Sequence, residues 1–438
     1  MTYIAFLKKY RIPFTVLLAV QLIILGNAWT NQHIFTNDSA EYLQQARNIM
    51  YEGHWSCAGE NDTEADVSLH SRRPPGYAIF IILTSAGLNL PLLTLLIQCL
   101  LSVFNLTFSL NLLVKATGKK PPGILIAAFF VFFPSQFIYA TQFMTEIPFQ
   151  TSLLLGAFFL IEFLQGRSTK IFMLQQLCWL SAYLLKPVAF LIWIPAWMVC
   201  ALKEGWSANR TAMLGGAALH ILVIGLSIFN NYRHTGAAEY SSIGTKLLVN
   251  YNLPAIIRNG RGEAELARYM DSLQNQLATR EYATQRSIII HETINQAIDH
   301  PSAAIAAHVK GFIRFFIDPC RWDIQLFLEG NEPENSKESL IDLFKSHRAR
   351  VMVEALRNLN PLYLLYVSLT VITTTVLTLL FFLSLLRNHL SFPGKYLLAG
   401  IVFYIALMTG PSASARFRVP VFPLIVVIAA TCRVRRAG

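Results

Sequence analysis

Long apolar runs alternate with short polar segments along almost the whole chain. The longest runs approach or exceed the roughly 20 residues with which a helix crosses a bilayer. They cover residues 12–29, 90–114, 121–140, 147–165, 211–230 and 361–386. Shorter apolar runs at 171–185, 187–202, 395–410 and 419–432 bring the predicted number of spans to about ten. We therefore expect an all-α polytopic membrane protein with external juxtamembrane helices and a mostly helical external segment.

Basic residues between the runs predict which loops face the cytoplasm. Lys8, Lys9 and Arg11 precede the first run, so the positive-inside rule holds the N-terminus in the cytoplasm and places loop 30–75 outside. The apolar stretch 77–87 is too short to cross and is interpreted as re-entrant or interfacial. Three parts follow: an N-terminal transmembrane module (1–230), an external segment (231–360) and C-terminal transmembrane helices (361–438), with both ends inside.

Composition supports a membrane protein and argues against a nucleic-acid partner. The 438 residues are 54% hydrophobic and only 14% charged, whereas soluble domains average about 25% charged residues. The net charge of +11 arises from short basic clusters between apolar runs, which is typical of topology signals rather than of a binding face. No small-residue cleavage site follows the first run, so we interpret it as an anchor and not as a signal peptide.

One stretch of the external segment has helical amphipathic spacing. It predicts a helix that lies in the membrane interface or packs on its own domain. Its apolar positions are Ile305, Val309, Phe312, Ile313 and Phe316, with Lys310 and Arg314 opposite.

Ionisable residues gather in the loops assigned to the outer face, where such groups are candidates for function. Carboxylates together with Lys and Arg suit a reaction in which a hydroxyl is activated and a phosphate leaves. The carboxylates are Asp38, Glu41 and Glu146, and the cations are Arg72, Arg73, Lys186, Arg416 and Arg418.

Six short motifs, taken in their order and sidedness, resemble the polyprenyl-phosphate-sugar-dependent glycosyltransferases of the GT-C superfamily, near the protein O-mannosyltransferase and aminoarabinose-transferase branch. The motifs are Asn37-Asp38-Ser39-Ala40-Glu41-Tyr42, Arg73-Pro74-Pro75-Gly76-Tyr77, Thr145-Glu146, Leu185-Lys186-Pro187, Asn231-Tyr232-Arg233 before a loop with Ser242, Gly244 and Asn250, and Ala415-Arg416-Phe417-Arg418-Val419-Pro420. The chain departs from the family in that no basic residue adjoins Glu146.

The resemblance implies a transferase that moves a sugar, with inversion, from a polyprenyl-phosphate carrier to a glycan, lipid or protein acceptor. The site would lie on the extracytoplasmic face of the plasma (inner) membrane. Asp38 would be the general base or would orient the acceptor, Glu146 would be the second catalytic carboxylate, and Lys186, Arg416 and Arg418 would bind the leaving phosphate. Further substrate-binding candidates are Glu41, Tyr42, Arg72, Arg73, Tyr77 and Arg233. No cofactor is assigned, and assistance by a divalent metal ion is left open.

Simpler interpretations exist for each feature. Asp38 and Glu41 fit a capping box, Glu146 fits the N-terminus of a helix, and the Lys and Arg residues fit snorkelling anchors. A transporter or flippase of a lipid-linked or anionic substrate is the alternative function, although we see no inverted repeat. A membrane scaffold without activity would not need the outward carboxylates.

Two cysteines, Cys57 and Cys320, fall on the predicted outer face, where an oxidising compartment permits a disulfide between them. The alternative is that both are unpaired. His54, Cys57 and His70 do not have the spacing of a zinc site.

Overall fold

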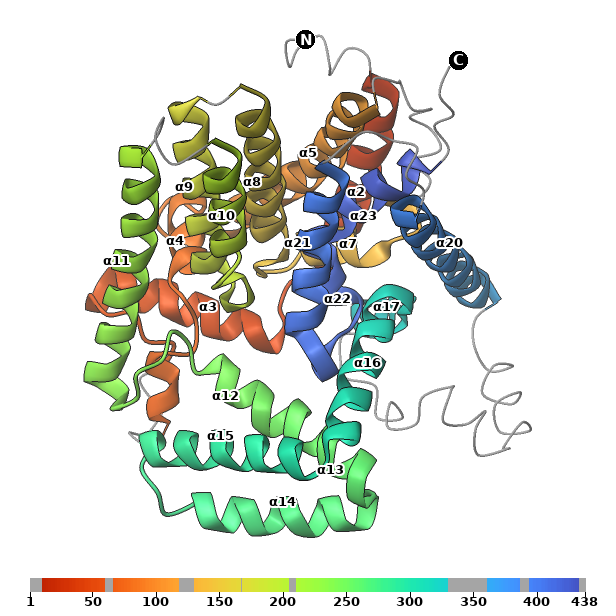
Figure 1. The fold of residues 1–438 in the computed structure, drawn as a ribbon. Coiled ribbons are helices and arrows are strands. Elements are labelled where there is room, and N and C mark those ends of the chain that lie inside the picture. The colour runs from red at the N-terminus through yellow and green to blue at the C-terminus, as the bar shows by residue number, and fades with distance from the viewer. Residues whose placement is uncertain are drawn as a thin grey trace.

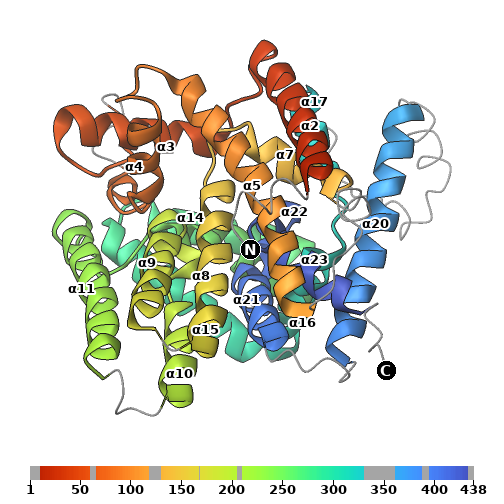
Figure 2. The same ribbon diagram turned by 90° about the horizontal axis from the view of Figure 1, so that it is seen from above.

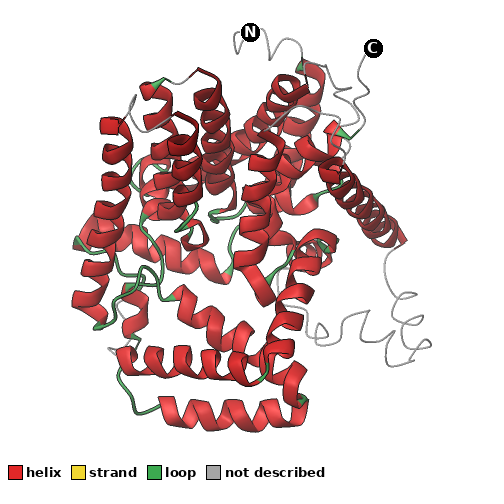
Figure 3. Cartoon of the chain, viewed as in Figure 1, coloured by secondary structure: helices red, strands yellow, loops and turns green. Residues whose placement is uncertain are grey.

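The computed structural model describes residues 10–59, 66–117, 130–166, 168–204, 210–329, 361–386 and 394–432. Within these ranges the secondary structure is helical, and no strand occurs (Figure 3). The first half contains α2 (Arg11–Thr30), α3 (Asn37–Arg47), α4 (Gly76–Thr84), α5 (Pro91–Thr117), α7 (Pro134–Ala140), α8 (Glu146–Gly166), α9 (Thr169–Leu185), α10 (Trp193–Glu204) and α11 (Arg210–Thr235). The second half contains α12 (Ile243–Leu247), α13 (Leu253–Arg261), α14 (Glu263–Leu277), α15 (Tyr282–Asp299), α16 (Pro301–Ile317), α17 (Arg321–Glu329), α20 (Pro361–Leu386), α21 (Gly394–Thr409), α22 (Ala415–Arg418) and α23 (Phe422–Thr431).

Six described helices are long and apolar enough to cross a membrane: α2, α5, α8, α11, α20 and α21. The protein is therefore a helical membrane protein by the length and composition of its helices. In both views α11 and α20 stand at opposite edges of the bundle (Figures 1 and 2). Few residues of either helix are buried inside the protein, as is typical of lipid-facing helices.

The remaining predicted spans do not form long continuous helices. In the predicted span 121–140, residues 121–129 lie outside the described part. The described remainder is interrupted before Pro134, which starts the short, buried α7. A proline readily occupies the first turn of a helix but cannot donate to a preceding turn. Helices α9, α10 and α23 have 17, 12 and 10 residues, and α4, at 9 residues, agrees with the prediction that 77–87 does not cross.

A second layer of helices lies at one end of the bundle. Helix α3 lies across the ends of α8 and α9, and α12 to α15 lie beyond it (Figure 1). This layer has a small apolar core of its own, built on the buried side chains Leu253, Ile257, Leu266 and Leu273. It is connected to the C-terminal helices through α16, which packs against α13, α20 and α21.

The amphipathic stretch predicted in the external segment is α16. Phe316 is buried and contacts the rings of Phe381 and Phe403. Ile305 and Val309 are exposed. The helix therefore packs on the protein with one face and leaves apolar side chains free on another.

Close backbone contact fixes α4 against α9. A Cβ atom on Gly76 would lie 2.5 Å from the backbone oxygen of Leu184, a distance that real Cβ atoms do not reach. Gly76 follows Arg73 in the chain, and Leu184 precedes Lys186 by two residues. A glycine at this position therefore lets two candidate site segments approach each other.

Candidate active site

The first carboxylate of the site is presented by a capped helix. Thr36 is the N-cap of α3, and its hydroxyl accepts from the Ser39 amide at 3.3 Å while the Ser39 hydroxyl accepts from the Thr36 amide at 2.9 Å. The Ser39 hydroxyl also donates to the backbone oxygen of Phe143, and this bond connects the start of α3 to the segment before α8. The capping box is thus Thr36 with Ser39, and the alternative interpretation of Asp38 with Glu41 as the box is wrong. Because the cap is made without them, both carboxylates are available for other contacts.

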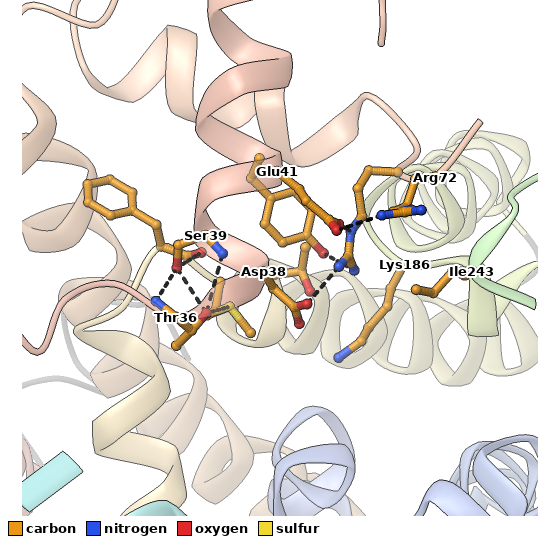
Figure 4. A network of polar contacts seen from close by, with 12 residues as sticks. Thr36, Asp38, Ser39, Glu41, Arg72, Lys186 and Ile243 are labelled. Carbon is orange, nitrogen blue, oxygen red and sulfur yellow. Dashed lines mark hydrogen bonds and ion pairs between the residues drawn. The ribbon is translucent and has the colours of Figure 1, made fainter. Parts of the chain in front are cut away.

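Arg73 gathers the two carboxylates of α3. Its Nε donates to Glu41 at 2.6 Å and one terminal nitrogen donates to Asp38 at 2.7 Å. Its guanidinium lies 4.9 Å from the centre of the Tyr42 ring and donates to the Tyr42 hydroxyl at 3.3 Å. Arg72 donates to the other oxygen of Glu41 at 3.2 Å (Figure 4). Two consecutive arginines therefore fix the side chains of one helical turn.

Arg416 joins this turn to a second carboxylate. Its terminal nitrogen donates to Asp38 at 2.5 Å and its Nε donates to Glu146 at 2.6 Å. Lys186 donates to the same Glu146 oxygen at 2.8 Å. In Figure 4 the Lys186 side chain extends toward the side of α3 that bears Asp38. The cluster unites segments that are up to 378 residues apart in the chain.

We call these residues the ion cluster: Asp38, Glu41, Arg73, Glu146, Lys186 and Arg416. Glu146 is fully buried at the first position of α8, and Lys186 is buried at the C-terminal end of α9. The sequence shows no basic residue next to Glu146, yet the fold supplies two from elsewhere. For Lys186 and Arg416, the interpretation as snorkelling anchors is wrong, because both charged groups face buried carboxylates rather than a membrane surface.

The charges of the cluster set its protonation state. Burial raises the pKa of the Asp38 carboxyl, but the adjacent Arg416 and Arg73 outweigh this and hold that pKa well below its ordinary value. Burial lowers the pKa of the Lys186 ammonium, and Glu146 only partly restores it. A carboxylate with so low a pKa is a weak general base at neutral pH. The geometry therefore suits Asp38 to orienting a hydroxyl and balancing charge better than to taking a proton.

Some predicted site residues do not join the ion cluster. Arg418 is buried, and its guanidinium donates to the backbone oxygens of Phe316 and Asp318 at 2.6 Å each. These contacts are a helix cap, so the structure does not support Arg418 as a phosphate ligand. Arg233 is exposed at the end of α11. Tyr77 is buried and donates to Gln98. Its ring packs edge-on against Tyr42, so it holds the Tyr42 ring in place rather than facing a substrate.

Sequence reasoning missed three buried residues: Tyr139 and Asp323 near the cluster, and Glu239 farther along the chain. The guanidinium of Arg416 lies 5.7 Å from the ring centre of Tyr139, and the Tyr139 hydroxyl donates to Asp323 at 2.8 Å. Glu239 accepts from Ser71 of the loop 30–75 and from Arg286 of α15. No motif marks these residues, because each contact crosses more than 40 positions of the chain.

Of the two alternatives for Cys57 and Cys320, the structure shows the unpaired one, and no disulfide joins them. Both cysteines are free and buried, and burial raises the pKa of each thiol to about 12. His54 pairs with Glu52 at 2.6 Å. Within the described residues no three His, Cys, Asp or Glu side chains are grouped in a way that could hold a metal ion.

Comparison of the chain with protein-family models, with curated proteins and with solved structures finds no match.

Proposed function

We propose that the protein is an integral-membrane glycosyltransferase that moves a sugar from a polyprenyl-phosphate carrier to an acceptor at the outer membrane surface. The observation that carries this proposal is the bridge that Arg416 makes between Asp38 and Glu146, with Lys186 on the same glutamate. Both cations are thus held by the buried Glu146 at the start of the apolar helix α8. A phosphate at the head of a membrane lipid would meet them at that depth.

The chemistry follows from where charge develops. When the bond between sugar and phosphate breaks, negative charge grows on the departing phosphate. Cations that are already fixed stabilise that charge without reorganisation. In this proposal Arg416 and Lys186 take that role, and Asp38 orients the acceptor hydroxyl on the opposite face of the sugar. The hydroxyl oxygen bonds to the anomeric carbon as the bond to the phosphate breaks, and the hydroxyl proton leaves to solvent. A single displacement of this kind inverts the anomeric configuration.

The position of the charges favours transfer over transport. A transporter commonly holds its charged site near the bilayer midplane, between broken helices. Here Glu146 begins α8, Lys186 follows the last residue of α9, and Asp38 lies in the first turn of α3. The cluster thus lies at helix ends, and its most exposed members are Asp38 and Arg416, each about a quarter exposed.

The proposal includes a finer topology of about ten crossings, with segment 231–360 and the ion cluster on the extracytoplasmic face of the plasma (inner) membrane. Lys119 and Asn335, which fall on opposite sides of this topology, lie outside the described residues. Glu265 in α14 and Ser168 before α9 are described and are not buried. We expect a cysteine at Glu265 to react with an impermeant thiol reagent in intact cells and a cysteine at Ser168 to be protected until the cells are opened. Labelling of Ser168→Cys in intact cells contradicts this topology.

The direct test is release of polyprenyl phosphate from a donor labelled in its sugar. Purified wild-type protein in lipid nanodiscs is expected to release it in the presence of an acceptor extract, and Arg416→Ala is expected to raise the Kd of the donor about 10- to 100-fold. Loss of one charge-assisted hydrogen bond to phosphate has that magnitude. Arg416→Lys should recover only part of the affinity, since an ammonium cannot contact Asp38 and Glu146 through a fork.

A matched control is Arg258→Ala, which removes an exposed arginine that pairs with Glu263 in the second layer of helices. It should leave donor affinity unchanged. Equal donor affinity in Arg416→Ala and wild type would place the carrier phosphate elsewhere.

A further inference from the structure

Helices α16 and α22 cap each other. The last carbonyls of a helix have no partner within it, and Arg418 of α22 donates to the backbone oxygens of Phe315, Phe316 and Asp318 at the end of α16. In return the carboxylate of Asp318 accepts from the amide of Ala415, the first residue of α22, at 3.1 Å. The second layer of helices (α12 to α15) is therefore connected, through α16, to α22, the short helix that carries Arg416.

A backbone contact reinforces this arrangement. A Cβ atom on Gly311 of α16 would lie 2.0 Å from the backbone oxygen of Gly410, in the turn that leads from α21 to α22. No side chain separates the two segments there. The end of α16 and the segment that precedes Arg416 are thus in direct contact.

Asp323, in the helix that follows α16, is connected to the Arg416 side chain through Tyr139. Asp323 of α17 is buried, and its carboxylate accepts from two hydroxyls of α7, Ser135 at 2.5 Å and Tyr139 at 2.8 Å. The ring of Tyr139 lies against the guanidinium of Arg416, with 5.7 Å between guanidinium carbon and ring centre. A chain of contacts therefore runs from Asp323 through Tyr139 to the cation at the centre of the ion cluster.

We propose that Asp323 is a positioning residue for Arg416, because its carboxylate fixes the Tyr139 ring on which the guanidinium rests. The ring face is negative and attracts the cation. A hydroxyl that donates to a carboxylate cannot rotate freely, so the ring stays at one angle and keeps Arg416 between Asp38 and Glu146. The catalytic part of this inference rests on the proposed function.

The environment of Asp323 makes this support dependent on pH. Burial raises the pKa of the Asp323 carboxyl to about 6, opposed by the Ser135 hydroxyl and reinforced by the nearby Asp318. Tyr139 and Arg416 also oppose this rise, and the Cys320 thiol is a further titratable neighbour. Above pH 6 the charged carboxylate accepts from both hydroxyls. Below pH 6 it carries a proton that competes for one of those contacts, and the hold on Tyr139 weakens.

Three variants separate positioning from a general structural role. Asp323→Asn removes the charge, Tyr139→Phe removes the hydroxyl but keeps the ring, and Ser135→Ala removes the other donor and leaves the path to Arg416 intact. With labelled donor, wild-type kcat is expected to fall as pH drops through about 6. This fall should disappear in Asp323→Asn and Tyr139→Phe, with kcat lowered about tenfold at pH 7.5 and KM for the donor changed less than threefold. In Ser135→Ala the fall should persist and move to higher pH, because a hydrogen bond that favours the charged form is lost.

If kcat of Tyr139→Phe falls below pH 6 as it does in the wild type, the proposal is overturned. If the wild type releases no polyprenyl phosphate, the proposed function fails by itself, and thermal unfolding decides the positioning claim. The melting temperatures of Tyr139→Phe, Arg416→Lys and the double variant would then be compared. We expect the double variant to melt no lower than the less stable single variant, since both changes break one chain of contacts. Additive losses would show that Tyr139 and Arg416 act separately, and would overturn the inference.

Discussion

Asp38→Asn is expected to fold and to lose about 100-fold of the sugar-transfer rate, the size of effect that misplacing a reacting group by about 1 Å can have. The cap of α3 is made by Thr36 and Ser39, so the helix start does not depend on the changed side chain. The variant keeps the shape of the residue and removes its negative charge. Arg73 and Arg416 then lose their shared partner, and the acceptor hydroxyl loses the charged oxygen that orients it.

The measurement compares the release of polyprenyl phosphate by variant and wild type at saturating donor. Asp66→Asn is the matched control, because Asp66 is a half-exposed carboxylate that pairs with Arg72 at 3.0 Å outside the ion cluster. It should retain near-normal turnover. If Asp38→Asn turns over donor at the wild-type rate, the carboxylate has no part in the chemistry.

The sequence pattern predicted correctly those features that depend only on neighbouring residues, such as the location of long apolar helices. Apolar runs located α2, α5, α8, α11, α20 and α21, because length and hydropathy suffice to identify a spanning helix. The same rule was less reliable for 419–432. There α23 has only 10 residues, nearly all of them buried within the protein. A buried core helix and a membrane span are both apolar on all sides, and composition does not separate them.

The details of the site depended on tertiary contacts that no local pattern encodes. The capping-box template favours Glu or Gln at the third position, so it selected Asp38 with Glu41 over Thr36 with Ser39. Arg416 and Arg418 are two positions apart and chemically equal in the sequence. One bridges two carboxylates and the other caps a helix. Only the placement of α22 against α16 distinguishes them.

The partner of Glu146 shows the same limit. Its neighbours in sequence suggested an unpaired carboxylate, whereas Lys186 and Arg416 reach it from 40 and 270 positions away. A buried carboxylate without a cation would be protonated or unstable. Its presence at the start of an apolar helix therefore predicts that a cation is near, although it does not say which one.

Glu146→Gln is expected to lower the free energy of unfolding by about 3–5 kcal/mol, the cost of breaking a buried ion pair by removal of one partner. The wild-type ion cluster balances three carboxylates against three cations: Asp38, Glu41 and Glu146 against Arg73, Lys186 and Arg416. The variant leaves one buried positive charge without compensation. Thermal unfolding in nanodiscs at constant pH measures the loss.

The informative comparison is the double variant Glu146→Gln, Lys186→Met. Lys186→Met alone leaves a surplus negative charge next to Arg416, and together the two changes restore neutrality with side chains of similar size. We expect the double variant to unfold at a higher temperature than Glu146→Gln, because replacing both partners of a buried pair is often neutral while removing one is not. Its transfer activity should nevertheless remain low, since the second cation for the leaving phosphate is gone. A double variant no more stable than Glu146→Gln would mean that the glutamate acts through its hydrogen bond to Arg416 and not through the charge balance of the cluster.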